Sequence, residues 1–192
     1  AAVDWGRRAI RAAPQWGEAY SHMLFSMNYA SSLSPAEIFR EHLEWGRRFA
    51  DPLTPAAATH PNPPDPERRL RVGYVSGDFR MHVVSIYILP VFEAHDRSRV
   101  EVFGYSNAPG ADTTTRRLRD RTDHWREINE LSDAAAAEAI RRDGIDILVD
   151  LNGHTAHNRL LLFARKPAPV QVSWLGYVNT TGAFLGAIIL GN

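Results

Sequence analysis

The spacing of apolar residues changes twice along the chain. In residues 1–50, β-branched residues are few and apolar positions recur at roughly helical intervals, which predicts two or three helices. Residues 51–68 hold six prolines, which remove backbone donors and disfavour helical geometry in the residues before them. From residue 69 onward, short apolar runs alternate with amphipathic stretches. The pattern predicts a helical segment at 1–50, a proline-rich linker at 51–68 and an α/β lobe at 69–192.

The helical segment carries one helix with clear signals at its start. Ser34 is a suitable N-cap, Pro35 fits the first helical position, and Glu37 completes a capping box. The residues that follow predict one buried face by their helical spacing: Ile38, Phe39, His42, Leu43, Trp45 and Phe49. Residues 9–24, with Pro14 between two helical stretches, loosely resemble the junction of two tetratricopeptide repeats.

The lobe at 69–192 alternates between two kinds of pattern. Short apolar runs predict strands at 70–76, 100–106, 124–128, 145–151 and 170–175. The stretches between them predict helices near 83–95, 113–121, 132–142 and 158–165. Such alternation implies parallel strands joined by right-handed crossovers. The predicted fold class is therefore α/β, a Rossmann-like parallel sheet preceded by a small all-helical, tetratricopeptide-like segment.

Polar loops follow three predicted strands, and in a parallel sheet the carboxyl ends of the strands meet at one edge, where ligands bind. The first loop delivers His82 to the start of a helix, where the helix dipole keeps neutral imidazole available as a base or acceptor. An ordinary histidine at a helix start is the competing interpretation. Six other polar residues at this edge are predicted to contact a substrate: Asp78, Asn152, His154, Asn179, Thr180 and Thr181.

Several standard motifs are missing from these loops. The first loop contains neither G-x-G-x-x-G nor the P-loop pattern, which argues against dinucleotide and NTP sites of those types. Ser76, Asp78 and His82 are the residue types of a catalytic triad, but no G-x-S-x-G elbow surrounds the serine, which argues against a hydrolase. Two histidines in the second loop, with Asp150 nearby, suggest a metal; histidines in a turn are commonly plain loop residues, so no metal site is predicted.

Composition narrows the classes of partner. Lys and Arg together number 22, as do Asp and Glu, so the net charge is zero and the basic surface that nucleic acid requires is not expected. The chain has no cysteine, which fits a reducing, cytoplasmic location. Its apolar runs are far shorter than the roughly 18 residues of a membrane span, and no secretory signal is visible. We expect neither nucleic acid nor a membrane as a partner.

Four stretches of the lobe together resemble a known family. They are LRVGYVSGDFRMH at 70–82, VEVFGYSN at 100–107, DGIDILVDLNGHT at 143–155 and FARKPAPVQVSWLGYVNTTG at 163–182. In this order they resemble the protein O-linked N-acetylglucosamine transferases of glycosyltransferase family 41 and their bacterial and plant relatives. The resemblance runs from about residue 68 to the end. The helices before it resemble the tetratricopeptide-proximal segment that precedes the catalytic region in that family.

The resemblance implies the first lobe of a GT-B glycosyltransferase, an enzyme that transfers a sugar from a nucleotide donor to Ser or Thr of a protein without a metal. His82 matches the active-site histidine of the family's D-F-x-x-H element. The expected donor is UDP-GlcNAc, the expected partner is a protein or peptide acceptor, and no cofactor is expected. In the family a second lobe supplies most nucleotide contacts, so we expect this chain to be inactive without that lobe.

Two alternatives remain open. Plant relatives that resemble this family transfer fucose from GDP-fucose, and the base-reading lobe that distinguishes the donors lies outside the resemblance. The chain also departs from the family pattern, because Val83 and Val178 stand at turns where the family usually has proline or, after the histidine, a small residue. The second alternative is therefore a noncatalytic protein-binding module built on a tetratricopeptide array.

Overall fold

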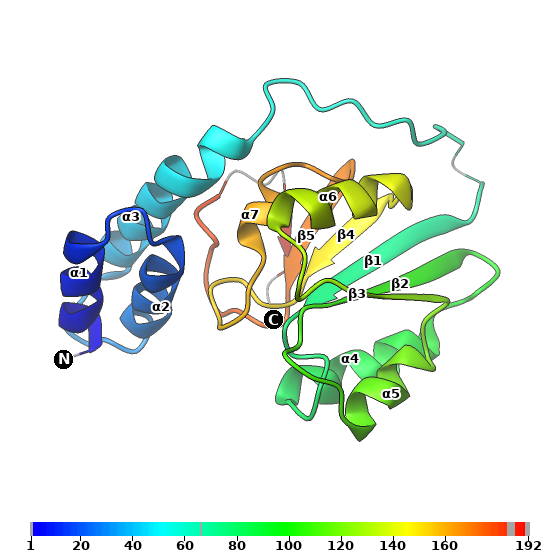
Figure 1. Ribbon diagram of the computed structural model, residues 1–192, viewed down its shortest axis with the longest axis horizontal. Coiled ribbons are helices and arrows are strands. Elements are labelled where there is room, and N and C mark those ends of the chain that lie inside the picture. The colour runs from blue at the N-terminus through cyan, green and yellow to red at the C-terminus, as the bar shows by residue number, and fades with distance from the viewer. Residues whose placement is uncertain (1, 66, 184–186, 191–192) are drawn as a thin grey trace.

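The computed structural model describes residues 2–65, 67–183 and 187–190. A helical segment and an α/β lobe lie side by side (Figure 1). The helical segment consists of α1 (Ala2–Ala12), α2 (Gly17–Met27) and α3 (Pro35–Trp45), and α3 continues into a π-helical turn at Gly46–Ala50 and a 3-10 turn at Asp51–Leu53. No helix in the described ranges combines the length and the apolar character that crossing a bilayer needs.

A six-stranded parallel sheet, in the order β3-β2-β1-β4-β5-β6, forms the centre of the lobe. Its strands are β1 (Leu70–Ser76), β2 (Val100–Ser106), β3 (His124–Glu127), β4 (Ile147–Asp150), β5 (Val170–Trp174) and β6 (Ala187–Leu190). This is the strand order of a Rossmann-like sheet, so the predicted fold class is confirmed. The sequence pattern predicts five of these strands and misses β6, because periodicity alone does not distinguish so short an apolar run from helix.

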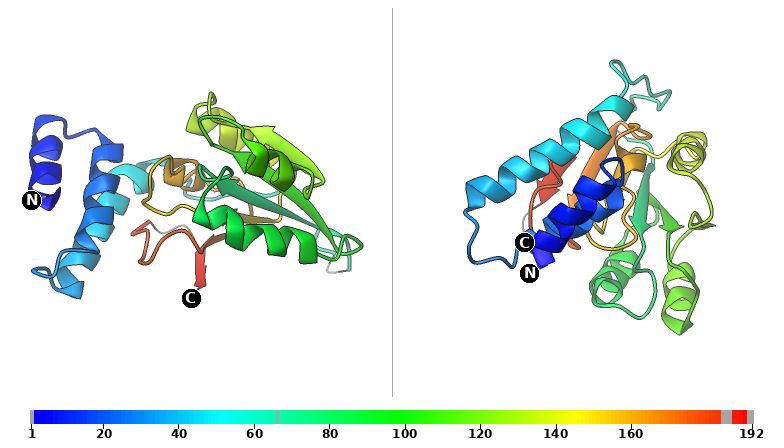
Figure 2. Two further views of the ribbon diagram at one scale, coloured as in Figure 1. Left: turned by 90° about the horizontal axis from the view of Figure 1, so that it is seen from below. Right: turned by 60° about the vertical axis from the view of Figure 1, so that its left-hand side comes forward.

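Helices cover both faces of the sheet (Figure 2). They are α4 (Val83–Ala94), α5 (Thr113–Arg119), α6 (Asp133–Arg142) and α7 (Leu160–Phe163). On one face Ile88 of α4 and Leu118 of α5 belong to one buried apolar cluster. On the other face Ile140 of α6 and Phe163 of α7 belong to a second cluster. Successive residues of each strand point to opposite faces, so β1 contributes to both clusters.

One predicted helix of the lobe is shorter than its sequence pattern. The prediction places a helix at 158–165, whereas α7 is a single turn. Lys166 has a φ of 51°, outside the helical region, and it precedes Pro167. A proline disfavours helical geometry in the residue before it, so the chain leaves the helix here and turns into β5.

Helix α3 confirms the predicted start and corrects the predicted buried face. The Ser34 side chain accepts the Glu37 N–H, and the Glu37 carboxylate accepts the Ser34 N–H, as a capping box requires. His42 and Trp45 are buried, but two residues predicted on the same face, Phe39 and Leu43, are 49% and 46% exposed. The prediction is wrong for these two because the helix turns a narrower stripe toward the lobe than the apolar spacing suggested.

The helical segment and the lobe share one core. Leu24 of α2 and Trp45 of α3 lie in the same buried cluster as Leu160 and Phe163 of α7. The helices therefore depend on the lobe for the burial of their apolar faces.

The backbones of α3 and of the turn that continues it lie very close to the loop after β5. A Cβ at Gly46 would lie 2.0 Å from the Gly182 carbonyl oxygen, and one at Gly182 would lie 1.9 Å from the His42 carbonyl oxygen. Gly182 also has a φ of 69°, which favours glycine. Two glycines therefore set the distance between α3 and this loop.

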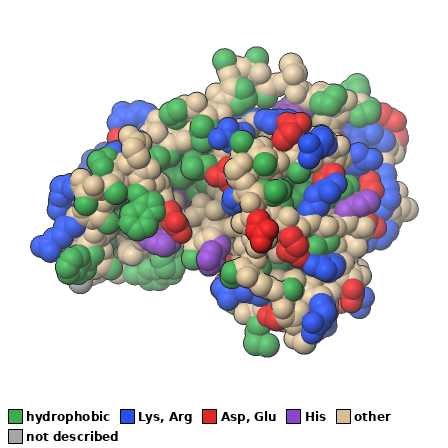
Figure 3. All heavy atoms as spheres, viewed as in Figure 1, with side chains coloured by type: hydrophobic (Ala, Val, Ile, Leu, Met, Phe, Trp, Pro, Cys, Tyr) green, Lys and Arg blue, Asp and Glu red, His purple; other side chains and the backbone are tan. Residues whose placement is uncertain are grey.

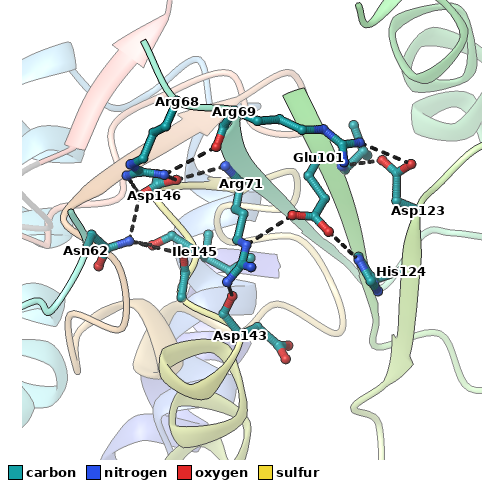
Figure 4. A network of polar contacts seen from close by, with 12 residues as sticks. Asn62, Arg68, Arg69, Arg71, Glu101, Asp123, His124, Asp143, Ile145 and Asp146 are labelled. Carbon is teal, nitrogen blue, oxygen red and sulfur yellow. Dashed lines mark hydrogen bonds and ion pairs between the residues drawn. The ribbon is translucent and has the colours of Figure 1, made fainter. Parts of the chain in front are cut away.

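The connector between the two parts is fastened to the amino edge of the sheet (Figure 4). Among the described residues from 54 to 69, none lies in a helix or strand. Asp146, just before β4, is 5% exposed and accepts hydrogen bonds from Asn62 at 2.6 Å, Arg68 at 2.7 Å and the Arg71 N–H at 2.8 Å. Burial alone would raise the pKa of Asp146, but these donors outweigh it and lower that pKa. The carboxylate thus ties the connector to the sheet.

We expect Asp146→Asn to lower the free energy of unfolding at pH 7 by about 2 kcal/mol, because Arg68 loses a charged partner. The native pKa of Asp146 is lowered, so its stabilisation is present above the unfolded value of about 3.9 and is lost as pH falls through the native pKa. The difference between variant and parent should therefore shrink in acid, as measured by urea unfolding from pH 7 to pH 3. Asp120→Asn, at an exposed aspartate, is the control. An unchanged difference across this range would contradict the role of the charge.

We also expect Gly46→Ala to destabilise the chain by about 1–3 kcal/mol through the contact with Gly182. Gly46 has helical dihedral angles, and in an open helix alanine would instead stabilise by up to about 1 kcal/mol. Thermal unfolding shows whether Gly46→Ala raises or lowers the stability. Gly110→Ala is the control, since no described atom lies within 4 Å of a Cβ at Gly110. Greater stability in Gly46→Ala would show that α3 is free to move away from the loop.

Candidate functional site

A crevice of about 370 Å³ opens at the carboxyl edge of the sheet. It lies between the start of α4, which follows β1, and the loop that follows β5. Its described lining residues are His82, Val83, Val84, Tyr87, Leu175 and Gly176. Parallel strands bring these two segments to the same edge although they lie far apart in sequence. The crevice is the candidate site.

His82 lies at the mouth of this crevice as the N-cap of α4. Its backbone is extended, and its Nδ1 accepts the Val84 N–H at 3.3 Å. Asp78 Oδ2 lies 3.7 Å from the same nitrogen, and the His82 side chain is 37% exposed. The sequence prediction placed this histidine at a helix start beside the ligand edge, and the structure has it there.

Asp78 and Asn152 form a buried cluster beneath His82. Asp78 is 6% exposed and Asn152 2% exposed. The Asn152 amide donates to Asp78 Oδ2 at 2.9 Å, and its oxygen accepts the Gly77 N–H at 2.9 Å. Asn152 therefore joins the loop after β4 to the loop after β1 and fixes the carboxylate next to His82. Three predicted site residues are brought together in this way.

The turn that carries Asn152 is built around a buried carboxylate. Asp150, at the end of β4, accepts the Asn152 N–H at 3.1 Å, the Gly153 N–H at 2.9 Å and the Ser173 hydroxyl at 3.0 Å. Burial raises the pKa of Asp150, while these three donors favour its charged form. Asp150 shapes the loop after β4 from inside the protein and does not line the crevice.

His154 lies away from the crevice, between the lobe and the helical segment. The ring is fully buried; Nδ1 is 2.9 Å from the Ser21 hydroxyl of α2, and Nε2 is 2.9 Å from the Thr181 carbonyl oxygen. A carbonyl only accepts, so Nε2–H donates to Thr181 and Nδ1 accepts from Ser21. Burial lowers the pKa of His154 to about 3, so the ring is neutral. Its contacts join two parts of the protein.

The loop at 176–182 also reaches toward the helices. Tyr177 hydrogen-bonds His42 at 2.7 Å and Asn28 at 2.9 Å, and Asn179 donates to the Asn28 side chain at 2.8 Å. Thr180 accepts the N–H of Gly182 within the loop. Thr181 is 3% exposed.

Of the seven predicted site residues, His82 is the one found among the described lining residues of the crevice. For the other six, contact with a substrate stays a prediction, since the structure shows each with partners inside the protein. Sequence reasoning missed the crevice residues Tyr87 and Leu175 and the helical partners Ser21, Asn28 and His42. One feature of the sequence could have indicated that His42 has a polar partner: it is a polar residue within an otherwise apolar helical face.

The geometry offers little support for the catalytic triad and the metal site considered from the sequence. Ser76 is fully buried and its hydroxyl accepts the Asp78 N–H, so it shapes the turn. Within the described ranges, no three His, Asp or Glu side chains are grouped to hold a metal ion.

The surface around the two parts carries charges of both signs. Blue and red side chains are interspersed over the right-hand part of the face shown in Figure 3. A second hollow, of about 270 Å³, lies between α2 and the lobe and is lined by residues such as Glu18, Asn107 and Arg159.

Comparisons with known proteins agree with this geometry. The family described as Glycosyl transferase family 41 matches residues 53–191. A probable UDP-N-acetylglucosamine–peptide N-acetylglucosaminyltransferase SPINDLY of Solanum lycopersicum is 39% identical over 177 residues, which cover 90% of this chain and 19% of that protein. The UDP-N-acetylglucosamine–peptide N-acetylglucosaminyltransferase of Caenorhabditis elegans is 44% identical over 125 residues, which cover 64% of this chain and 11% of that protein.

A solved structure is similar over nearly the whole chain. It is a mutant of the Thermobaculum terrenum O-GlcNAc transferase, with a TM-score of 0.91 and 48% sequence identity. The match covers 95% of this chain and 35% of that chain. The chain thus spans about a third of this transferase and 19% of the tomato relative.

Proposed function

The chain belongs to glycosyltransferase family 41, and we propose that it is the first catalytic lobe of an enzyme that transfers N-acetylglucosamine from UDP-GlcNAc to Ser or Thr of proteins. The observation that carries the proposal is the position of His82 at a crevice on the ligand edge of a Rossmann-like sheet, within the segment matched by the family. The names of the relatives support the donor and the peptide acceptor.

His82 is suited to the proton transfer that this reaction requires. As the acceptor oxygen bonds to the sugar carbon, the bond from that carbon to the UDP oxygen breaks and UDP leaves with the electron pair. The acceptor hydroxyl must also lose its proton, and a positioned neutral imidazole is a common base for this step. In the structure Nδ1 accepts the Val84 N–H, so for Nε2 to take that proton this hydrogen bond must be released and Nδ1 must carry a hydrogen. Asp78 Oδ2, 3.7 Å from Nδ1, lies just beyond hydrogen-bond range and is the acceptor that we propose for that hydrogen during the reaction.

The remaining predicted residues divide into two groups in this proposal. Asn152 positions Asp78, and Asp78 orients His82, so both act through the histidine. The contacts of His154, Asn179 and Thr181 support a role in holding the loops against the helical segment. Thr180 is half-buried within the loop, and direct contact with a sugar or phosphate remains part of the proposal for it.

The rest of the site comes from a second lobe, which in the family closes the crevice and binds most of the nucleotide. The helical segment is the side from which a protein acceptor would approach, as in a tetratricopeptide array. The proposal needs no metal and no cofactor, and it places the protein in the cytoplasm, in keeping with a chain that lacks cysteine.

In the protein that contains both lobes, we expect His82→Ala to lower kcat at least about tenfold, because the general base is lost. The measurement is transfer of labelled N-acetylglucosamine to a peptide acceptor, with circular dichroism to check folding. His124→Ala removes a partly exposed histidine on β3 and serves as the control. Unchanged turnover in a folded His82→Ala variant would instead favour a noncatalytic binding module.

We expect UDP to bind the protein with both lobes more tightly than GDP does, because UDP is the nucleotide of the proposed donor and the second lobe reads the base. Isothermal titration calorimetry with the two diphosphates, with and without EDTA, compares the donors and tests the need for a metal. Tighter binding of GDP would move the proposal to a fucosyl donor. Sugar transfer by this chain alone would overturn the claim that the site requires a second lobe.

A further inference from the structure

One wall of the crevice has a strained backbone. Leu175 and Gly176 line the crevice, and Leu175 has a φ of 75°, in the left-handed region that side chains with a Cβ rarely adopt. Such a conformation costs of the order of 1–3 kcal/mol and persists only where the surroundings hold it. Contacts of the neighbouring residues must therefore hold Leu175 in this conformation.

Tyr177, two residues later, is fixed by the helical segment. The His42 Nδ1 lies 2.7 Å from the Ile38 carbonyl oxygen, so Nδ1–H donates there and Nε2 is left as an acceptor. The Tyr177 hydroxyl, 2.7 Å from Nε2, donates to it and accepts from the Asn28 side chain at 2.9 Å. Burial lowers the pKa of His42, which keeps the ring neutral and the acceptor in place.

The fit around the Tyr177 ring is close as well. A Cβ at Gly153, which has a φ of 55°, would lie 2.3 Å from the Tyr177 Cβ, and one at Gly176 would lie 1.7 Å from the Leu151 carbonyl oxygen. The loop after β5 is thus pressed against the loop after β4 on one side and hydrogen-bonded to α2 and α3 on the other.

We infer that Tyr177 is a positioning residue through which the helical segment holds Leu175 and Gly176 in place opposite His82. The inference rests on the proposed function, because it gives the crevice wall a part in catalysis. It makes α2 and α3 structural components of the site, because they determine the shape of a crevice whose described lining residues come from other elements. Asn28 and His42 hold the crevice wall through the Tyr177 hydroxyl, and Asn28 also accepts a hydrogen bond from Asn179 in the same loop.

The test uses Tyr177→Phe, which removes the hydroxyl and keeps the ring, in the protein that contains both lobes. We expect amide hydrogen exchange in residues 175–182 to rise several-fold and kcat/KM for the donor to fall about tenfold, because a displaced wall weakens alignment. Asn28→Ala, which removes the second partner of the hydroxyl and also the acceptor of Asn179 in the same loop, should produce the same two effects.

Tyr74→Phe is the matched control. Its hydroxyl also lies 2.7 Å from a histidine Nε2, that of His95, and it is buried, but it belongs to the core beneath α4. This variant loses the same kind of hydrogen bond, so we expect a similar fall in thermal stability without faster exchange at 175–182 and without a fall in kcat/KM.

Three results would overturn the inference: unchanged exchange at 175–182 in Tyr177→Phe, equal effects in Tyr74→Phe, or unchanged kcat/KM despite faster exchange. His82→Ala measured alongside separates the two proposals. Full turnover in that variant would overturn the proposed function. Lost turnover in it, together with normal kcat/KM in Tyr177→Phe, would overturn the positioning role alone.

Discussion

Parallel pairing of β1 with both β2 and β4 is the constraint on which the rest of the structure depends. Because all strands run in one direction, every loop that follows a strand emerges at the same edge and every connection that enters one lies at the other. The two edges have taken different roles. The carboxyl edge holds the His82 crevice, and the amino edge holds the charged network around Asp146 that fastens the connector.

Buried polar groups give each edge a defined shape. Asp146 directly precedes β4 and Asp150 ends it. Each carboxylate accepts several hydrogen bonds from surrounding donors. In the protein interior, where the dielectric constant is low, leaving either carboxylate or one of its donors without a partner would cost free energy. These groups therefore favour one arrangement of the loops over its alternatives. Asp150 orders the turn that carries Asn152, and Asn152 in turn fixes Asp78 beside His82.

The helical segment is an integral part of the lobe in this architecture. Its apolar stripe completes the core over α7, and its polar residues complete the hydrogen bonds of the loops after β4 and β5. The glycine contact between Gly46 and Gly182 leaves little room for sliding between the two. The helical segment and the crevice are therefore in direct structural contact, because the loop after β5 takes part in both.

The sequence by itself determined the kind and order of most elements, the parallel sheet, the start of α3 at Ser34 and the position of His82 at a helix start. These depend on local spacing, caps and turns, which a short window contains. It also carried enough family motifs to indicate the class of reaction. It did not reveal β6, because periodicity does not distinguish so short an apolar run from helix, and the prediction for α7 overlooked the effect of Pro167 on Lys166. It did not reveal the exposure of Phe39 and Leu43, because exposure depends on what packs against each segment.

Tertiary structure alone decided which polar loop residues line the crevice and which face the interior. His154 and Thr181 look like site residues in sequence, yet they are buried. Ser21, 133 residues away along the chain, hydrogen-bonds the His154 ring, and that ring donates to the Thr181 carbonyl oxygen. Tyr177 becomes an anchor only when α2 and α3 bring Asn28 and His42 to its hydroxyl. The physical reason is that burial and hydrogen-bond partners are properties of the assembled protein, whereas spacing along the chain specifies only which side chains are available.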